Sequence, residues 1–417
     1  MATFQGYTPQ PWQADVHRYL ANTLGTGKIA VVKSKRQCGK TYMCENQLLF
    51  FAINYCNSVS AMLSPTLSQS RKVFKELVKA IQDSNIIKRK NETLLEIDLI
   101  NGSQIFFKSS EQRDSLRGYT ISGILIIDEA AFISDDILQL VSPWCNVHRA
   151  PMLIVSTPMF KNGFFYRYYE IGLNNSKEIK SFDWNDYDTS VFLSAEQLEN
   201  YRQIIPKSQF RTEYLGLFAD DNAGVFSGYK ECIIPRGINT TYKQLYVGID
   251  FSNQTGNDYT VLSALNERGE QVFLYYFNDK TNSQQVDFIC NFLEQHRAQV
   301  RIVVPELNSL GSPLTDSIKQ RCQWVNIEGH ITSNKSKNEI INNLQLAFER
   351  KEIKIMDDEK QTKELGVYAM EFNPKTRNIT YNAPQGLNDD TCIALALSWK
   401  AFNSATSFGQ YMISFSR

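Results

Sequence analysis

The stretch VVKSKRQCGKTY, residues 31–42, constrains the fold of this chain more than any other. It follows the short apolar run KIAVV, residues 28–32, and precedes a run with apolar side chains at helical spacing. It fits the spacing G-x-x-x-x-G-K-[ST], with serine in the first glycine position. A strand, a loop and a helix in this order predict an α/β domain whose loop holds phosphate. The four matching positions are Ser34, Gly39, Lys40 and Thr41.

The chemistry of such a loop gives each of its parts a role. Backbone N–H groups surround the phosphate oxygens, Lys40 reaches the β- and γ-phosphates of ATP, and the Thr41 hydroxyl ligates Mg²⁺. The alternative is an ordinary strand-to-helix turn, which the missing first glycine leaves open. The residues expected to contact the nucleotide are Ser34, Lys35, Arg36, Gln37, Cys38, Gly39, Lys40 and Thr41.

A second stretch, GILIIDEAA, residues 123–131, supports the first. Its apolar run is typical of a strand that is buried on both faces, and it ends in two carboxylates, Asp128 and Glu129. The carboxyl ends of parallel strands meet at one edge of a sheet, so these acids should lie beside the loop. Asp128 would then orient the Mg²⁺ shell, and Glu129 would act as general base on the attacking water. A helix cap is the alternative interpretation.

Two further stretches fit the same site. LIVSTPMF, residues 153–160, is a strand that ends in hydroxyl side chains, and Thr157 with its neighbour Ser156 could sense the γ-phosphate. A simple turn before proline is the alternative. Upstream of the loop, Trp12 and Gln13 could stack on and hydrogen-bond an adenine, or could instead pack an N-terminal helix.

The pattern of the chain changes near its middle. With 417 residues the chain is long enough for two domains. Short apolar runs predict a mainly parallel sheet in residues 1–218, and alternation across Asn101-Gly102 predicts a hairpin within it. Small and acidic residues indicate a linker at 219–242. Three alternating strands, then helix and strand units, predict a second α/β domain at 243–417.

Composition excludes several classes of protein. The 44 basic and 44 acidic residues balance, so any contact with nucleic acid must come from local patches. Eight cysteines without a CxxC pair favour reduced thiols and make a zinc site improbable. We find neither a signal-like start nor an apolar run that approaches 18 residues, so we expect a soluble, unsecreted protein without membrane contact.

The order of the motifs WQ, SKRQCGKT, LRGYT, IIDEAAF and STP resembles the large terminase subunit of tailed phages. The resemblance covers nearly the whole chain and implies an ATP-driven DNA-packaging motor. In that family the phosphate loop departs from the common pattern in the same way. Arg36 matches the family's proposed cis-acting arginine finger, which would stabilise charge on the γ-phosphate in the transition state. A solvated loop side chain is the alternative for Arg36.

The resemblance also implies an RNase H-like nuclease domain in the second half. Asp250 lies in the strand VGIDFS, where a buried carboxylate must be paired or bind metal. Glu306 ends RIVVPE, and Asp389 with Asp390 begins the apolar run in GLNDDTCIALALSWKAF. Acids from three separate segments suit a two-metal site for Mg²⁺ or Mn²⁺. The alternatives are a helix N-cap for Asp389 and a surface charge for Glu306, and either Asp389 or Asp390 could touch metal.

These features predict an ATPase that moves double-stranded DNA and an endonuclease that cuts concatemers, in one chain. The rivals are a repair helicase with a nuclease, and an ATPase with an RNase H-like clamp that does not cut. The resemblance implies double-stranded DNA, a portal protein and a small terminase subunit as partners. It further implies a monomer in solution, a homo-oligomeric ring on the portal, and a place in the host cytoplasm and transiently at the procapsid. The second acid of the expected nuclease site, Glu306, is Glu where some relatives have Asp. Lys335 and Lys337 resemble a basic stretch near the nuclease site of the family.

Overall fold

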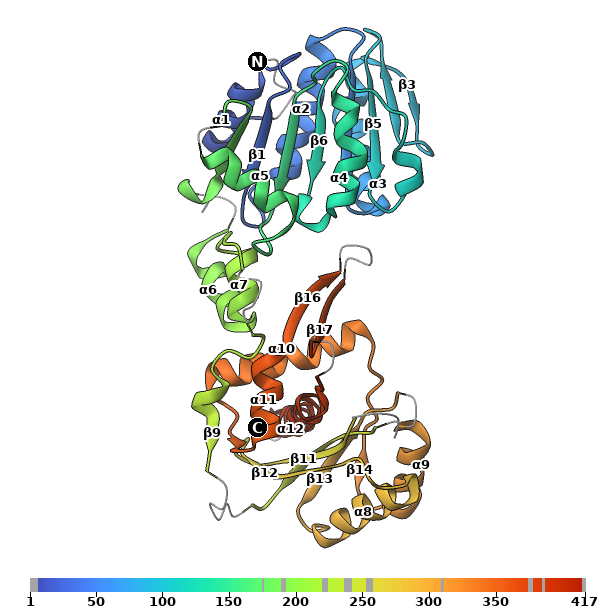
Figure 1. The fold of residues 1–417 in the computed structure, drawn as a ribbon, viewed down its shortest axis with the longest axis vertical. Coiled ribbons are helices and arrows are strands. Elements are labelled where there is room, and N and C mark those ends of the chain that lie inside the picture. Colours follow the sequence, from blue (N-terminus) through green and yellow to red (C-terminus); the bar gives the residue numbers. More distant parts are fainter. Residues whose placement is uncertain are drawn as a thin grey trace. The chain divides into compact units, whose positions relative to one another are not determined.

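The structure is a computed structural model in which the chain forms two compact units (Figure 1). One unit comprises Met1–Gln203 with Ser208–Asp221, and the other Ile204–Lys207 with Asn222–Arg417. The structure describes residues 7–174, 176–188, 193–219, 224–235, 242–252, 258–308, 311–373, 378–384 and 387–414.

The first unit is built on an eight-stranded sheet with the order β3-β4-β5-β2-β6-β7-β1-β8. All pairs from β5 to β8 are parallel, and β4 is antiparallel to both β3 and β5. The mainly parallel sheet expected from the short apolar runs is therefore confirmed. The strands are β1 (Ile29–Lys33), β2 (Val59–Ser64), β3 (Ile87–Asn91), β4 (Glu96–Leu99), β5 (Gln104–Ser109), β6 (Leu125–Asp128), β7 (Met152–Ser156) and β8 (Ile179–Asp183).

The predicted hairpin is the antiparallel pair β4 and β5, joined across Asn101-Gly102. Gly102 has φ +84°, which glycine adopts without steric cost. The Asn101 amide donates to the backbone oxygen of Ala52, 2.8 Å away, at the end of the helix that follows the loop. The hairpin turn is thus tied to that helix.

Helices cover both faces of this sheet. Apolar side chains of α1, α2 and α3 pack with Ala30 and Val32 on one face, while α4 and α5 pack with Val31 on the other. This alternation along β1 is the two-residue period of a strand that is buried on both sides. The helices are α1 (Pro11–Leu20), α2 (Lys40–Asn54), α3 (Leu67–Ile81), α4 (Asp135–Val141), α5 (Gly163–Leu173), α6 (Ala195–Ile204) and α7 (Lys207–Glu213). The 3₁₀ turns of this part of the chain are η1 (Gln82–Ser84), η2 (Arg113–Leu116), η3 (Ala130–Phe132), η4 (Ser142–Cys145) and η5 (Trp184–Asp186).

The second unit is built on a mixed five-stranded sheet with the order β12-β11-β10-β13-β14. The three alternating strands predicted from the sequence are β10, β11 and β12, and they pair antiparallel. Parallel pairing adds β13 beside β10, and then β14 beside β13. The strands are β10 (Leu245–Asp250), β11 (Thr260–Asn266), β12 (Gln271–Phe277), β13 (Val300–Pro305) and β14 (Asn326–Ile327).

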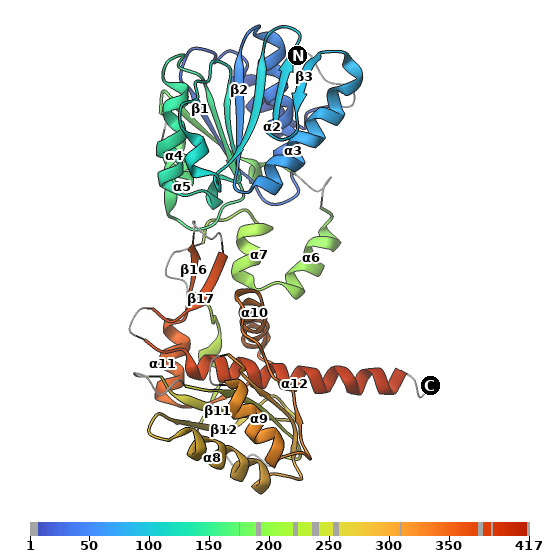
Figure 2. The ribbon, with the colours of Figure 1, turned by 90° about the vertical axis from the view of Figure 1, so that its right-hand side faces the viewer.

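Helices cover both faces of this sheet too. The face with Val247 packs on α8 and α9, and the face with Tyr246 packs on α10, α11 and α12. Figure 2 shows α12 lying across the sheet. A Cβ atom added to Gly248 of β10 would stand only 2.3 Å from the backbone oxygen of Ala394 in α12, so the helix packs directly on this strand. The helices are α8 (Asn282–Gln295), α9 (Gly311–Arg321), α10 (Asn334–Arg350), α11 (Glu359–Val367) and α12 (Asp390–Ser414). Two short two-stranded sheets complete the described part of this unit: β15 (Ile355–Met356) pairs with β9 (Ile233–Ile234), and β16 (Ala369–Asn373) pairs with β17 (Asn378–Asn382).

Part of the stretch interpreted as a linker packs into the second unit. Val225 and Phe226 join the core that α12 contributes to, as does Cys232, the last residue of the 3₁₀ turn η6 (Tyr229–Cys232). The next strand, β9, pairs with β15. Residues 220–223 and 236–241 of the expected linker lie outside the described residues. The burial of these apolar side chains explains why residues 224–235 have fixed structure despite their small and acidic neighbours. Among the described residues, we find no helix of sufficient length and apolarity to span a membrane.

Candidate functional site

The loop between β1 and α2 folds as a compact turn. Gly39 caps α2 with φ 73°, and Gln37 also adopts a left-handed conformation, with φ 59°. The Ser34 N–H donates to the Ser156 oxygen over 3.1 Å, which fixes the start of the loop to the end of β7. The loop therefore lies at the carboxyl edge of the sheet, beside the end of β7 and one strand away from β6, which are the strands that the sequence predicts to carry the other site residues.

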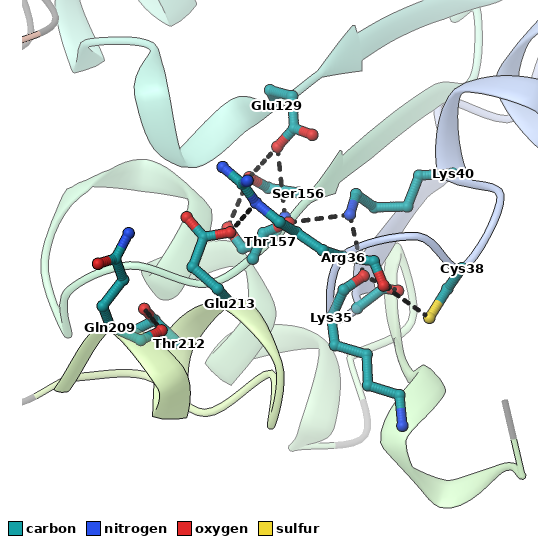
Figure 3. Close-up of polar contacts among 11 residues, drawn as sticks. Lys35, Arg36, Cys38, Lys40, Glu129, Ser156, Thr157, Gln209, Thr212 and Glu213 are labelled. Carbon is teal, nitrogen blue, oxygen red and sulfur yellow. Dashed lines mark hydrogen bonds and ion pairs between the residues drawn. The ribbon is translucent and has the colours of Figure 1, made fainter. Parts of the chain in front are cut away.

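The side chain of Lys40, the first residue of α2, reaches back toward the loop (Figure 3). Its side chain is buried, and its Nζ donates to the Lys35 oxygen at 3.1 Å and to the Thr157 Oγ1 at 2.9 Å. The predicted phosphate-binding lysine and the predicted phosphate sensor are thus in direct contact, although 117 positions separate them. Phosphate oxygens would replace these two acceptors when a nucleotide binds.

Thr41 and Asp128 meet beside Lys40. The Thr41 hydroxyl donates to Asp128 Oδ2 at 3.1 Å, and the Glu129 N–H donates to Asp128 Oδ1 at 3.0 Å. Burial, and then the charge of Glu129, raise the pKa of Asp128 to about 7, against the opposing effects of Lys40 and Thr41. A buried carboxylate with a raised pKa and a hydroxyl beside it form an oxygen pair that a hard cation such as Mg²⁺ would stabilise.

Glu129 follows β6 in a conformation that non-glycine residues avoid. Its φ is 49°, a left-handed conformation whose cost is about 1–3 kcal/mol and which is commonly found at functional sites. Its Oε2 accepts from Ser156 Oγ at 3.4 Å and from the Thr157 N–H at 3.5 Å. These long contacts orient the carboxylate toward the loop without neutralising it, as a general base requires.

Trp12 and Gln13 hold the loop in place from α1. The indole N–H of Trp12 donates to the Cys38 oxygen at 3.3 Å, and the Gln13 amide donates to the Gly39 oxygen at 3.1 Å. Both side chains are buried, so Trp12 packs α1 as the alternative interpretation has it. An adenine contact by Gln13 would require the exchange of its bond to Gly39, and this contact stays a prediction.

Arg36 has a partner that the sequence did not indicate. Its side chain forms an ion pair with Glu213, and its backbone N–H donates to the Glu213 oxygen at 2.8 Å. Glu213 is the last residue of α7 and lies far downstream, in a segment without any recognisable motif. Only a tertiary contact reveals it.

In the second unit, two of the predicted acids come together. Asp250 ends β10 and Glu306 directly follows β13, and these two strands are parallel neighbours. The Glu306 N–H donates to the Ile249 oxygen at 2.9 Å, and the carboxyl groups of Asp250 and Glu306 are close enough to interact electrostatically. Burial raises the pKa of Asp250 well above its ordinary value, and the charges of Glu306, Asp390 and Asp389 raise it further.

Asp389 and Asp390 stand at the start of α12 with different partners. Asp389 accepts from Lys337 Nζ at 3.0 Å, while its backbone oxygen begins the helix by accepting from Ile393. Asp390 accepts from the Tyr259 N–H at 2.9 Å. Burial raises the pKa of Asp390 to about 7, although the bond from Tyr259 opposes this. The N-cap interpretation of Asp389 and its metal-binding interpretation both remain open.

The four acids of the second unit are electrostatic neighbours but do not enclose a metal position. Within the described ranges, we find no group of three Asp, Glu, His or Cys side chains that could hold one ion. Lys337 and the Tyr259 N–H hold the two carboxylates of α12 where they are. Burial first, and then the neighbouring carboxylates, raise the pKa of Asp250, and a divalent cation would offset both effects. The residues therefore fit such an ion, while their ligand roles stay predictions.

The first half of the chain matches a known protein family. Residues 34–232 match the family model described as "Terminase large subunit, T4likevirus-type, N-terminal". This range begins at the first residue of the phosphate loop and includes α7 with Glu213.

Relatives and solved structures extend the likeness to nearly the whole chain. The large terminase subunit of Thermus virus P23-45 is 24% identical over 97% of this chain and 89% of its own length, and that of Thermus phage G20c has the same figures. A large terminase from another thermophilic bacteriophage covers 94% of this chain and 98% of its own, with 16% identity and a TM-score of 0.56. That bacteriophage protein is also known in complex with ADP and with ATP-gamma-S, with TM-scores of 0.54 and 0.55. With the loop, Asp128 at the end of β6 and Glu129 directly after it in these positions, the chain is similar to terminase large subunits over nearly its whole length.

Proposed function

We propose that this chain is the large subunit of a viral DNA-packaging motor. It hydrolyses ATP to drive double-stranded DNA into a procapsid, and a second site cuts concatemeric DNA with the help of divalent metal ions. The observation that carries the ATPase assignment is the meeting of three segments: Lys40 contacts Thr157, and Thr41 contacts Asp128. These are the groups that phosphoryl transfer needs at one point.

Each residue of the first site has a role in hydrolysis. Residues 34–39 would surround the phosphates with backbone N–H groups, and Lys40 would neutralise their charge. Thr41 and Asp128 would hold Mg²⁺, which supplies charge neutralisation at the phosphate oxygens. Glu129 orients the attacking water and accepts its proton, while Arg36 stabilises the charge that develops on the γ-phosphate. The nucleotide complexes of the thermophilic bacteriophage terminase support ATP as the ligand.

The nuclease assignment rests on the pairing of Asp250 with Glu306. Two neighbouring carboxyl groups, of which Asp250 is buried at the end of a strand, are costly unless they serve to hold cations. Asp250, Glu306 and one or both of Asp389 and Asp390 would hold Mg²⁺ or Mn²⁺. Such ions supply a polarised water and neutralise charge on the phosphodiester.

The partners and the location of the chain are part of the same proposal. A large terminase subunit implies DNA and packaging machinery as partners, and we infer contacts with a portal protein and a small terminase subunit. The net charge is zero, so the chain has no global field that would keep it on DNA, and processive movement should need a ring on the portal. We expect a monomer in the host cytoplasm that assembles transiently at the procapsid.

The test compares hydrolysis with and without procapsids that carry a portal, and measures DNA packaging by its protection from added nuclease. We expect weak ATPase from the isolated chain and strong stimulation by procapsids. Vigorous DNA-dependent hydrolysis by the isolated monomer would favour the helicase rival. Metal-dependent nicking of a plasmid distinguishes the nuclease from the non-cutting clamp. If the second unit is a clamp, the plasmid stays intact while ATP is still hydrolysed.

A further inference from the structure

A buried histidine, His330, lies in line with two of the predicted acids of the second unit. β10, β13 and β14 are neighbouring strands of one sheet, and β10 and β13 stay in register up to Ile249 and Pro305. The next pair along them is Asp250 and Glu306, and an isolated parallel bridge joins Glu306 to His330, beyond the end of β14. Residues that pair in a parallel register point their side chains to the same face of a sheet. The three side chains therefore form a row at the carboxyl edge of this sheet.

The backbone around His330 is fixed to the backbone around Glu306. The Leu307 N–H donates to the His330 oxygen at 2.8 Å, and the His330 N–H donates to the Pro305 oxygen at 2.8 Å. These two bonds lie on either side of Glu306 in the chain. The histidine ring is thus held beside the strand end that carries the acid.

The two ring nitrogens of His330 have different surroundings. Nδ1 lies 2.8 Å from Nζ of Lys400, which belongs to α12. An ammonium group has only protons to donate, so Nδ1 accepts this bond and the neutral ring carries its proton on Nε2. His330 is 5% exposed, and its Nε2 is buried without a hydrogen-bond partner among the described residues. A buried N–H without an acceptor is unfavourable, so we expect another state of the site to supply one.

This acceptor must come from the protein, because a nitrogen that is closed off from the surface meets neither water nor DNA. The charges of two carboxylates act on the ring, those of Glu306 and Glu339. Glu339 is exposed and solvated by water, whereas Glu306 is the neighbour of His330 in the row. A carboxylate that ligates a cation must be charged, and it keeps oxygen lone pairs for further donors. Glu306 in its charged form therefore fits the Nε2–H of His330.

We propose that His330 is a positioning residue of the nuclease site, which donates its Nε2–H to the carboxylate of Glu306 when Glu306 ligates a divalent cation. Lys400 supports this role from α12 by keeping the proton on Nε2. The inference rests on the proposed nuclease function and deepens it, because it names a residue outside the acidic motifs that acts on the cation through Glu306.

The test is calorimetric titration of the full chain with Mn²⁺ in the absence of nucleotide. His330→Leu keeps a side chain of similar size but removes the donor, so it should weaken Mn²⁺ binding by about 10–100-fold, as the loss of a partner of a metal ligand commonly does. His330→Gln keeps an N–H donor near the place of Nε2, so its affinity should stay within about threefold of the unchanged chain. A loss as large in His330→Gln as in His330→Leu would overturn the proposal.

Two further variants serve as controls of this titration. His296→Leu should leave Mn²⁺ binding unchanged, because His296 packs against Phe273 and Phe292 on the face of the sheet that α8 and α9 cover. Asp250→Asn, measured alongside, gives the background from any other Mn²⁺ site in the chain. If His330→Leu does not fold, His330→Asn replaces it. The shorter amide keeps an acceptor for Lys400 but has no donor at the place of Nε2, so it should show the same loss.

Nuclear magnetic resonance of the full chain with labelled histidine gives a readout that does not depend on cleavage. Mg²⁺, which is diamagnetic, should move the Nε2–H proton signal of His330 downfield when it is added without nucleotide, because this N–H gains an acceptor. The signal is assigned by its loss in His330→Gln. In Glu306→Gln the same addition should leave the signal in place. A signal that saturating Mg²⁺ does not move in the unchanged chain would contradict the proposal.

The failure of this inference can be told from the failure of the nuclease assignment. If Asp250→Asn keeps metal-dependent cleavage, the nuclease site is wrong and the inference falls with it. If Asp250→Asn loses both cleavage and Mn²⁺ binding while His330→Leu keeps both, the nuclease site stands and only the role of His330 is wrong.

Discussion

The two sites of this chain balance their charges in opposite ways. In the first unit the cationic groups at the site meet partners: Lys40 reaches Thr157 and a backbone oxygen, and Arg36 meets Glu213. In the second unit Asp250 is buried near three other carboxyl groups, and of these four acids Asp389 is ion-paired, with Lys337. Cations lie at the centre of the first site, whereas carboxylates predominate in the second.

This difference predicts how each site responds to its ligand. A site with internal partners keeps its shape without a ligand, and the ligand acts by exchanging partners. A site of crowded carboxylates is unfavourable until cations arrive, so metal binding should stabilise the fold itself.

The largest effects should follow from changes in the first site. Lys40→Ala removes the cation at the centre of the loop, so nucleotide binding should be lost. Glu129→Gln keeps the loop intact and removes only the proton acceptor, so it should bind ATP normally while kcat falls by about 10²–10⁴. Calorimetric binding and steady-state ATPase rates, measured on both variants, separate the two roles. Near-normal turnover in Glu129→Gln would remove the general-base assignment.

Mn²⁺ should stabilise the second unit in the absence of nucleotide. At a hundredfold excess over Kd, mass action contributes about 2.7 kcal/mol, which corresponds to roughly 5–10 °C in the Tm of a unit of this size. Asp250→Asn should remove most of this shift. Scanning calorimetry with Mn²⁺ and with a chelator measures it. A shift of the same size in Asp250→Asn would place the ion elsewhere.

The pH dependence of metal-free stability should reflect the raised pKa of Asp390. In the folded chain this pKa is about 7, against an ordinary value of 3.8, because burial disfavours the charged form. The unfolded chain releases its proton first, so the stability contribution is present below about pH 4 and is lost as the pH rises to about 7. Asp390→Asn should make this decline shallower, by less than about 1.4 kcal/mol per pH unit. Urea titrations between pH 4 and 8 measure the slope, and an unchanged slope would contradict the assigned cause.

The smallest effect concerns the partner of Asp389. Lys337 donates to Asp389 at 3.0 Å and to Asn382 at 3.1 Å, and so occupies an oxygen of this carboxylate that a metal ion would need. Lys337→Gln should free it and strengthen Mn²⁺ binding by up to about fivefold, if Asp389 is a ligand. Lys335→Gln, on the same helix but exposed, is the control and should leave Mn²⁺ binding unchanged. No change in Lys337→Gln would point to Asp390 as the ligand from α12.

The sequence predicted those features that depend on local pattern. Apolar runs that end in Asp128, Ser156 and Asp250 identify strand ends, and parallel strands bring their ends to one edge of a sheet. The contacts of Lys40 with Thr157 and of Asp250 with Glu306 follow from that rule, and the structure places these residues together.

The features that the sequence did not predict depend on tertiary packing. Glu213 ends a short helix without a motif, and only the fold brings it to Arg36. Gln13 carries an amide that could serve a base or a backbone oxygen, and the sequence does not distinguish the two. Val225 and Phe226 lie among small and acidic residues, and their burial depends on contacts with distant helices.

The central claim is that one chain carries two independent catalytic sites. The most direct test measures ATP hydrolysis and Mn²⁺-dependent plasmid cleavage on the same preparations of Glu129→Gln and Asp250→Asn. The claim predicts that Glu129→Gln loses ATPase and keeps cleavage, while Asp250→Asn loses cleavage below detection and keeps ATPase within about twofold, because the two changes lie in different units with separate cores. Full cleavage by Asp250→Asn, or the loss of both activities in either folded variant, would contradict it.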